Sequence, residues 1–259
     1  MLPSVRIYSV YYKHFHNFPQ ALYVTPIQAG IANSDVHLDM IGDNTGDNIS
    51  TKNDLYSELT ALYWIMKNAQ RDSDALGFCH YRRYLINDQY KLFFKKRSRY
   101  YSKASKKAME SLLTPSLYRS YQELLSDHDV IVPRQDLIKK KGIFYTVEEA
   151  YHLEHIKKDW DVTLKVVCEK YPDYGKSIPI LCQQTKMFYN NIMIAPWKIW
   201  DSYSTWLFDI LFEVEKQIEL PKHGYQRRVM GFLAERLHNL FVIHNQLKTA
   251  YLTLGMFEE

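Results

Sequence analysis

Two adjacent arginines close a short apolar run in the stretch GFCHYRRYLI, residues 77–86. A guanidinium group keeps its charge and offers forked donors that match phosphate oxygens, but it is costly to bury. Arg82 and Arg83 could mark the surface end of a strand, or one of them could pair with an internal carboxylate such as Glu58. Alternatively, the segment from His80 to Arg83 binds an anion.

A second group of polar side chains lies in IGDNTGDNISTKN, residues 41–53. Short polar side chains cap helices and form turns, which explains two or three of them. The others could hydrogen-bond sugar hydroxyls or hold a divalent cation, although the spacing and the missing terminal Glu exclude an EF-hand. The members of this loop are Asp43, Asn44, Asp47, Asn48 and Asn53.

Several common catalytic motifs are absent from the sequence. It contains no GxGxxG, GxxxxGK[ST] or GxSxG, so dinucleotide-binding, P-loop and serine-hydrolase chemistries have no local support. His152 and His155 in YHLEH could face one zinc ion, but no third ligand is evident. We interpret them as surface or core histidines.

The elements that must position these residues alternate between strand and helix in the first half of the chain. Runs rich in β-branched and aromatic residues predict strands, and apolar residues at three- and four-residue spacings predict helices. The predicted strands are 5–11, 75–79, the HDVIVP stretch at 128–133 and 187–195. The predicted helices are 58–68 with a cap at Asn53 or Asp54, 117–125, 200–218 and 226–240.

This alternation predicts an α/β fold with an open, mostly parallel sheet flanked by helices, and a helical C-terminal portion from about residue 200. Ligands of such sheets bind beyond the carboxyl ends of the strands. His80 to Arg83 would leave the end of a central strand, which favours the anion-binding interpretation. We expect a single domain over residues 1–259.

A basic segment interrupts the otherwise mixed charge pattern. Gln89 to Met109 contains eight Lys or Arg and no Asp or Glu, interleaved with aromatic residues. It could be a solvated insertion at about 89–110, or residues 91–107 could contact an anionic membrane surface or a lipid-linked diphosphate. The net charge of +4 and the lack of a recognition motif argue against nucleic acid as a partner.

Cysteine usage and hydropathy bear on the compartment. Cys79, Cys168 and Cys182 form no CxxC pair, so we expect three reduced core residues. The N-terminus lacks the basic start and apolar stretch of a signal peptide, and no run of about 18 apolar residues could span a bilayer. These patterns predict a cytoplasmic protein, free or held peripherally at the inner face of the plasma membrane.

Several motifs together resemble a known family. PIQAG, DNTGDNIS..N, ELTALYW..KN, G..HYRRY, NNIMI and R..GFLAERL occur in the order found in bacterial capsular and exopolysaccharide biosynthesis glycosyltransferases, a group first described as a domain of unknown function. The resemblance runs from about Val5 to Leu240. It implies a GT-A-like fold and transfer of galactofuranose from UDP-galactofuranose to a lipid-linked surface glycan.

The resemblance also implies how the donor diphosphate is held. Many GT-A enzymes bind it through a metal on an Asp-x-Asp motif, but the matching place here reads His80-Tyr81-Arg82-Arg83. We therefore expect guanidinium groups to replace the metal. Mg²⁺ or Mn²⁺ on Asp43 and Asp47 stays open but is not expected. The residues assigned to the donor are Tyr11, Asp47, Asn48, Asn53, His80, Tyr81, Arg82, Arg83, Arg134 and Asn191.

Two of these assignments depend on the family architecture alone. The end of the first strand seats the uracil base in GT-A enzymes, which implies that Tyr11 or Tyr12 stacks on it, unless both belong to the core. Asn191 matches an Asn that many such enzymes place beside the donor sugar. It could equally pair with a strand edge.

An inverting transfer also needs a carboxylate that takes the proton of the acceptor hydroxyl. Glu235, Asp43 and Glu154 are the candidates, with Glu235 preferred, although Glu235 and Arg236 could simply form an ion pair. The alternatives to a galactofuranosyltransferase are a transferase for another UDP-hexose, such as UDP-galactopyranose, and a non-catalytic carbohydrate-binding assembly subunit.

Overall fold

The protein is described by a computed structural model that covers residues 1–15, 21–87 and 98–258. Nine strands of this part form one sheet in the order β12-β7-β13-β5-β4-β1-β2-β3, with β6 paired to β13 and β12 also paired to β4. The strands are β1 Val5–Tyr11, β2 Val24–Gln28, β3 Ile41–Gly42, β4 Ala75–His80, β5 Arg83–Ile86, β6 Arg99–Lys103, β7 Val130–Pro133, β12 Met193–Pro196 and β13 Thr249–Glu258.

The strands of this sheet run in mixed directions. β1 is parallel to β2 and β4, β2 to β3, and β13 to β6 and β7. In contrast, β12 is antiparallel to β4 and β7, and β5 is antiparallel to β4 and β13. The predicted α/β fold with a sheet between helices is confirmed. The sheet is less parallel than predicted, because the tight turn after β4 sends β5 back and because β12 enters beside β4 in the opposite direction.

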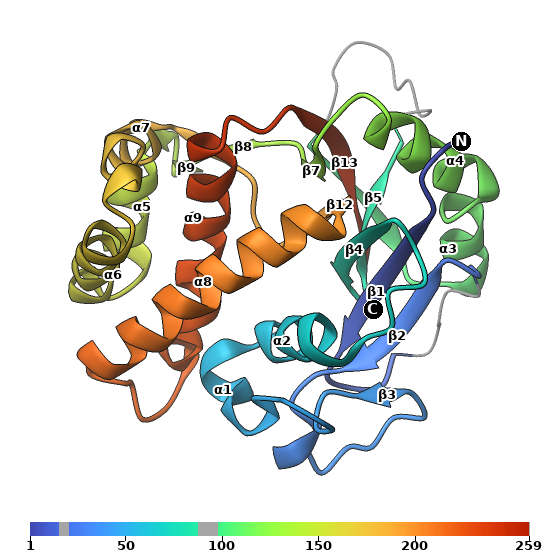
Figure 1. The fold of residues 1–259 in the computed structure, drawn as a ribbon, viewed down its shortest axis with the longest axis horizontal. Coiled ribbons are helices and arrows are strands. Elements are labelled where there is room, and N and C mark those ends of the chain that lie inside the picture. The colour runs from blue at the N-terminus through green and yellow to red at the C-terminus, as the bar shows by residue number, and fades with distance from the viewer. Residues whose placement is uncertain (16–20, 88–97, 259) are drawn as a thin grey trace.

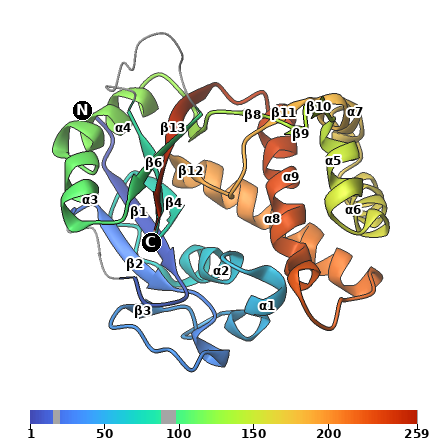
Figure 2. The same ribbon diagram turned by 180° about the vertical axis from the view of Figure 1, so that it is seen from behind.

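Helices cover both faces of the sheet (Figures 1 and 2). Along β1 the side chains of Tyr8 and Val10 belong to the core under α2, α8 and α9, whereas Ile7 and Tyr11 belong to the core on the side of α3 and α4. This two-residue alternation buries β1 on both faces, as expected of a central strand. The helices named here are α2 Leu59–Asn68, α3 Lys106–Leu112, α4 Pro115–Leu125, α8 Trp197–Gln217 and α9 Val229–His244.

Three further helices, α5 Val147–Glu154, α6 Lys157–Lys170 and α7 Ile178–Gln183, pack beyond α8 and α9, at the left of Figure 1. The helical portion predicted from about residue 200 therefore begins earlier in the chain. The chain then returns to the sheet, because β13 lies between β7 and β5. That strand was not predicted. No helix in the described ranges is long and apolar enough to cross a bilayer.

The structure departs from two predicted elements near the same end of the sheet. The helix predicted over 58–68 is confirmed as α2, but the predicted cap at Asn53 or Asp54 is wrong, because Asn53–Tyr56 form a separate helix, α1, and Ser57, with a positive φ of 51°, interrupts the helical backbone between the two. The strand predicted over 187–195 is reduced to β11 Lys186–Met187 and β12, with Asn190 and Asn191 in a left-handed turn between them. Both interruptions place polar groups at the end of β4.

The predicted basic insertion is only partly described, since residues 88–97 lie outside the described ranges. The described remainder of this insertion contains β6 and the start of α3, which pack against the rest of the protein. Arg99 in β6 forms an ion pair with Asp136, and Met109 in α3 is buried. The expectation of three core cysteines is wrong for Cys168, which is exposed on α6.

Candidate active site

Two adjoining cavities open where β1 and β4 end. The first encloses about 360 Å³ and the second about 250 Å³. The first is lined by Val10, Tyr12, Ala29, Asn53, Asp54, Ser57, Glu58, His80, Tyr81, Arg82, Arg83 and Arg228. The second is lined by Glu58, His80, Arg83, Arg99, Glu154, His155, Tyr189, Asn190, Tyr225, Arg228, Gly231, Phe232, Glu235 and Arg236. Because Glu58, His80, Arg83 and Arg228 line both, the two cavities form one continuous site.

Arginine side chains line both cavities, and three of them line the first. Arg82 lies in the tight turn after β4, Arg83 is the first residue of β5, and Arg228 enters from the short 3-10 turn Tyr225–Arg228 before α9. The Nε of Arg83 is buried and has no hydrogen-bond partner among the described residues. Burial and the neighbouring charge of Arg82 lower the pKa of Arg83, and the more distant Glu58 and Glu235 offset this shift only in part, so its charge is held at a cost. A bound anion would remove that cost.

The structural alternative for these arginines is not found. Neither Arg82 nor Arg83 forms an ion pair with a carboxylate of the described ranges. Glu58 instead lies 3.9 Å from Nη2 of Arg228 and accepts a hydrogen bond from the side chain of Asn191. Arg82 lies over the ring of Tyr81, with 5.7 Å from Cζ to the ring centroid.

His80 contributes no positive charge to this site at neutral pH. Its Nε2 lies 2.7 Å from the carbonyl oxygen of Asn190, which can only accept, so Nε2 carries the proton. Burial lowers the pKa of His80 and keeps the imidazole neutral. His80 lines both cavities, as expected of a residue assigned to the donor, and its hydrogen bond holds the Asn190 turn at the end of β4.

The turn at Asn190 and Asn191 orients two carboxylates of the site, Glu58 and Glu235. Asn tolerates the left-handed backbone better than other non-glycine residues, and these two have φ values of 75° and 51°. The backbone N–H of Asn190 donates to Oε1 of Glu235 at 2.8 Å, and Nδ2 of Asn191 donates to Oε1 of Glu58 at 2.8 Å. Asn191 is buried, does not line either cavity, and its side chain contacts Glu58 instead of a strand edge.

Glu235 projects from α9 into the second cavity. Burial raises its pKa, while Arg236 and the Asn190 N–H partly offset that shift. Arg236 is buried at 2% exposure, and its Nη1 lies 3.0 Å from Oε2 of Glu235. The predicted ion pair thus exists, yet it leaves the Glu235 carboxylate on the cavity wall. A carboxylate with a raised pKa can accept a proton from a hydroxyl near neutral pH.

The loop at 41–53 contributes less to the site than predicted. Asp43 is fully buried and accepts hydrogen bonds from the backbone N–H of Gly30 at 2.8 Å and from the hydroxyl of Ser50. Neither a proton-transfer role nor metal binding is compatible with that position. Asp47 accepts a hydrogen bond from the hydroxyl of Tyr63 in α2. The side-chain oxygen of Asn48 accepts one from the backbone N–H of Ser50 and so closes a turn.

Asn53 is the one member of that loop that lines the first cavity. Its Nδ2 donates to the carbonyl oxygen of Ser57 at 2.7 Å and to Thr60. The Cβ of an alanine at position 30 would lie 2.3 Å from Asn53 Cγ, and Gly30 has φ 68°. The glycine therefore lets the polar loop and α1 meet at the cavity wall.

Replacing Asp43 with Asn should lower the free energy of unfolding by about 1–3 kcal/mol, because the amide cannot accept all the hydrogen bonds of the carboxylate. Chemical denaturation measures this change. The folded variant should retain its ligand binding and turnover. A variant as stable as the wild type but inactive would instead restore Asp43 as a functional residue.

Two other predicted residues, Tyr11 and Arg134, lie differently from expectation, whereas Glu154 lines the second cavity as a candidate base should. Tyr11 has no exposed surface and packs on Tyr81 at 5.5 Å between ring centroids, so Tyr12, 55% exposed on the cavity rim, is the residue available for stacking. Arg134 follows β7 and is not among the residues that line the two cavities. Glu154 is exposed at the outer wall of the second cavity.

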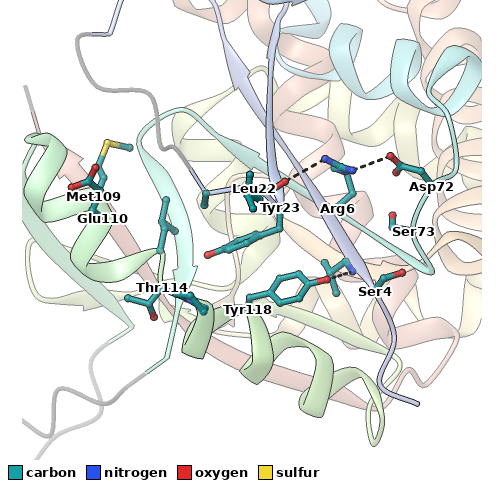
Figure 3. A pocket seen from close by; sticks show the side chains of 14 residues that line it. Ser4, Arg6, Leu22, Tyr23, Asp72, Ser73, Met109, Glu110, Thr114 and Tyr118 are labelled. Carbon is teal, nitrogen blue, oxygen red and sulfur yellow. Dashed lines mark hydrogen bonds and ion pairs between the residues drawn. The ribbon is translucent and has the colours of Figure 1, made fainter.

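A larger cavity of about 700 Å³ lies at the opposite end of β1 (Figure 3). Its polar groups are engaged with one another: Arg6 donates to the carbonyl oxygen of Leu22 and pairs with Asp72, and the N–H of Val5 donates to the Tyr118 hydroxyl. Its walls are largely apolar, and the cavity lies far from the carboxyl ends of the parallel strands. We assign no chemistry to it.

No cluster of three or more metal-ligating side chains occurs in the described ranges. His152 and His155 therefore belong to no such cluster. His155 stacks on Phe232 at 4.1 Å, and its Nδ1 lies 3.2 Å from Gln226. The described residues therefore offer arginines and several carboxylates to a ligand, but no preformed metal site. This combination suits an anionic ligand next to a group that must lose a proton.

Comparison with known proteins places the chain in a family. A family described as a domain of unknown function, DUF4422, matches residues 6–246. The chain belongs to this family. None of the curated proteins matches it.

The chain is also similar to a solved structure, the apo form of WbbM, described as a bifunctional glycosyltransferase. The TM-score is 0.88 at 28% sequence identity. The match covers 99% of this chain and 46% of that one, so this DUF4422 chain spans about half the length of the WbbM chain.

Three site residues of this DUF4422 chain were not predicted: Glu58, Asn190 and Arg228. All three stand in stretches that resemble the family, ELTALYW, NNIMI and R..GFLAERL. Glu58 had been considered only as an arginine partner, and Arg228 opens its motif. A polar or charged residue inside each quoted motif was the available signal.

Proposed function

We propose that this protein is an inverting glycosyltransferase that moves galactofuranose from UDP-galactofuranose to a lipid-linked surface glycan such as capsule, exopolysaccharide or O-antigen. The observation that carries the proposal is the half-buried Arg83 guanidinium, which shares the first cavity with Arg82 and Arg228, has a buried Nε without a hydrogen-bond partner, and forms no ion pair with a carboxylate of the described ranges. The similarity to WbbM supports the reaction class. The furanose donor and the acceptor rest on the resemblance of the sequence motifs.

The arginines would act on the leaving group. Transfer breaks the bond between the anomeric carbon and a diphosphate oxygen, and negative charge develops on UDP as that bond lengthens. Arg82, Arg83 and Arg228 would donate to the phosphate oxygens in a partly buried cavity, where such interactions are stronger than in water. Tyr12 on the rim would stack on the uracil.

The carboxylates would act on the other side of the sugar. Glu235, held by the Asn190 N–H, would accept the proton of the acceptor hydroxyl as that oxygen attacks the anomeric carbon from the face opposite UDP. Glu58 lines both cavities and would face the sugar between them. Asn191, which holds Glu58, is a positioning residue in this arrangement.

A donor screen tests the proposal directly. Purified protein is incubated with a synthetic galactoside acceptor and UDP-galactofuranose, UDP-galactopyranose or UDP-glucose, with and without EDTA. We expect UDP release and a new glycoside, with inverted anomeric configuration by NMR, from the furanose donor. We also expect EDTA to have no effect, because guanidinium groups replace the metal. Release from no UDP-sugar would contradict the function, and loss of activity in EDTA that Mg²⁺ or Mn²⁺ restores would contradict the role of the arginines.

A further inference from the structure

A small hairpin projects from the protein beside the second cavity. It consists of β9 Lys139–Lys140 and β10 Ile143–Phe144, joined by Lys141 and Gly142 with left-handed backbones of φ 49° and 89°. A Cβ added at Gly142 would meet no atom within 4 Å, so the turn stands free of other segments. Figure 2 shows β9 and β10 at the rim of the molecule, near α5 and α7.

The side chains of this hairpin are unusual for a protein surface. Ile143 is 59% exposed and Phe144 52% exposed, next to three consecutive exposed lysines. None of the three lysines forms an ion pair within the described ranges, and Lys139 lies 4.9 Å from the Phe144 ring centroid. The hairpin thus combines uncompensated positive charge with apolar surface at its tip, a pairing that favours the boundary of an anionic bilayer.

Two carboxylates near this hairpin in sequence are engaged elsewhere. Asp136 pairs with Arg99 at 2.6 Å, and Glu149 completes the capping box at the start of α5 with Thr146. The base of the hairpin is fixed, because Ile138 is buried and its N–H donates to the carbonyl oxygen of Thr185. The lysines therefore stand on a rigid support, and their charge is available to a partner.

The hairpin also borders the route into the active site. Lys139 and Lys140 line a third cavity of about 380 Å³, which shares Arg99, Glu154 and Tyr189 with the second cavity. Exposed Leu137 and Leu153 extend the apolar surface along its wall. A molecule held at the hairpin would lie at the outer mouth of a continuous path that ends at Glu235.

We propose that the hairpin of residues 139–144 docks the protein on the surface of an anionic phospholipid bilayer. The lysines contact the headgroups, and Ile143 and Phe144 enter the boundary with the acyl chains. This attachment turns the mouth of the third cavity toward the membrane, where a lipid-linked acceptor would be presented. Only that last consequence rests on the proposed function; the membrane contact itself does not.

Vesicle co-sedimentation of the full chain tests the proposal without reference to activity. We expect binding to vesicles of phosphatidylglycerol and phosphatidylcholine, no binding to phosphatidylcholine alone, and weaker binding as salt is raised. Replacing Lys139, Lys140 and Lys141 with Gln should lower the partition coefficient about a hundredfold, at about fivefold per lysine. Replacing Ile143 and Phe144 with Ser should lower it about tenfold or more.

Matched variants identify the docking surface. Lys103, Lys106 and Lys107, replaced together with Gln, remove the same charge from the described part of the basic segment, and Leu22→Ser removes an apolar side chain that is 96% exposed near β2. We expect both controls to bind as the wild type does. The proposal is overturned if the hairpin variants bind normally, if neutral vesicles bind equally well, or if only the triple variant of the basic segment loses binding. Thermal unfolding verifies that each variant is folded.

Discussion

Arg83→Met should abolish sugar transfer while leaving the protein as stable as the wild type, or more stable. Methionine keeps much of the apolar stem but removes a half-buried charge whose buried Nε has no partner among the described residues. Removing such a charge relieves a desolvation cost. Removing one preorganised donor to the developing charge typically costs about 10²–10³ in kcat. We therefore expect kcat to fall by at least this factor as the melting temperature holds or rises.

The controls for this prediction separate charge from geometry. Arg83→Lys keeps the charge but loses the forked donors, so we expect only partial activity. Arg71→Met removes an arginine whose guanidinium is already paired with Asp201 at 2.7 Å on the surface, and transfer should be unchanged. An Arg83→Met protein that loses both stability and activity would indicate a structural role instead. Full turnover by this variant would remove Arg83 from the mechanism.

Glu235→Gln should lower kcat by about 10²–10⁴ and leave UDP affinity unchanged, because the amide cannot accept the proton of the acceptor hydroxyl. Its oxygen can still accept from the Asn190 N–H, so the turn should persist. Burial raises the pKa of Glu235, and a base works only when deprotonated. The kcat/KM of the wild type should therefore fall as pH drops through this raised pKa, and the residual activity of the variant should lack that limb.

Glu58→Gln is the matched variant for that experiment. Its amide oxygen can still accept from Nδ2 of Asn191, and the substitution removes only the charge that faces Arg228. We expect a smaller loss than for Glu235→Gln and no loss of the acidic limb. If Glu58→Gln removes the limb and Glu235→Gln keeps it, the base is Glu58 and our assignment is wrong.

Local sequence patterns predicted the parts of the fold that depend on local physics. The buried run 75–79 and the first strand 5–11 were found because continuous apolar residues at the centre of a sheet leave a clear signal. β13 was missed, because its central place depends on pairing with β5 and β7, which are distant in sequence. The break at Asn190 and Asn191 was missed for a similar reason, since apolar neighbours on both sides resemble one strand.

The candidate site shows the same division. Arg82 and Arg83 stood out because charge directly after a buried strand is costly without a partner. Asp43 looked equally functional, but its carboxylate accepts hydrogen bonds from the backbone N–H of Gly30 and the hydroxyl of Ser50. Only the folded loop reveals these contacts. Glu58 looked like an ordinary residue before a helix. Ser57, with its positive φ, separates it from α1, and Asn191, distant in sequence, holds it at the cavity.

The crystal structure of the protein with UDP bound is the most direct test of the central assignment. We expect the diphosphate in the first cavity, with its oxygens within hydrogen-bond distance of the guanidinium groups of Arg82 and Arg83, and the uracil against Tyr12. A nucleotide bound elsewhere, with both guanidinium groups still free of it, would contradict the mechanism, even if the protein proved to be a glycosyltransferase.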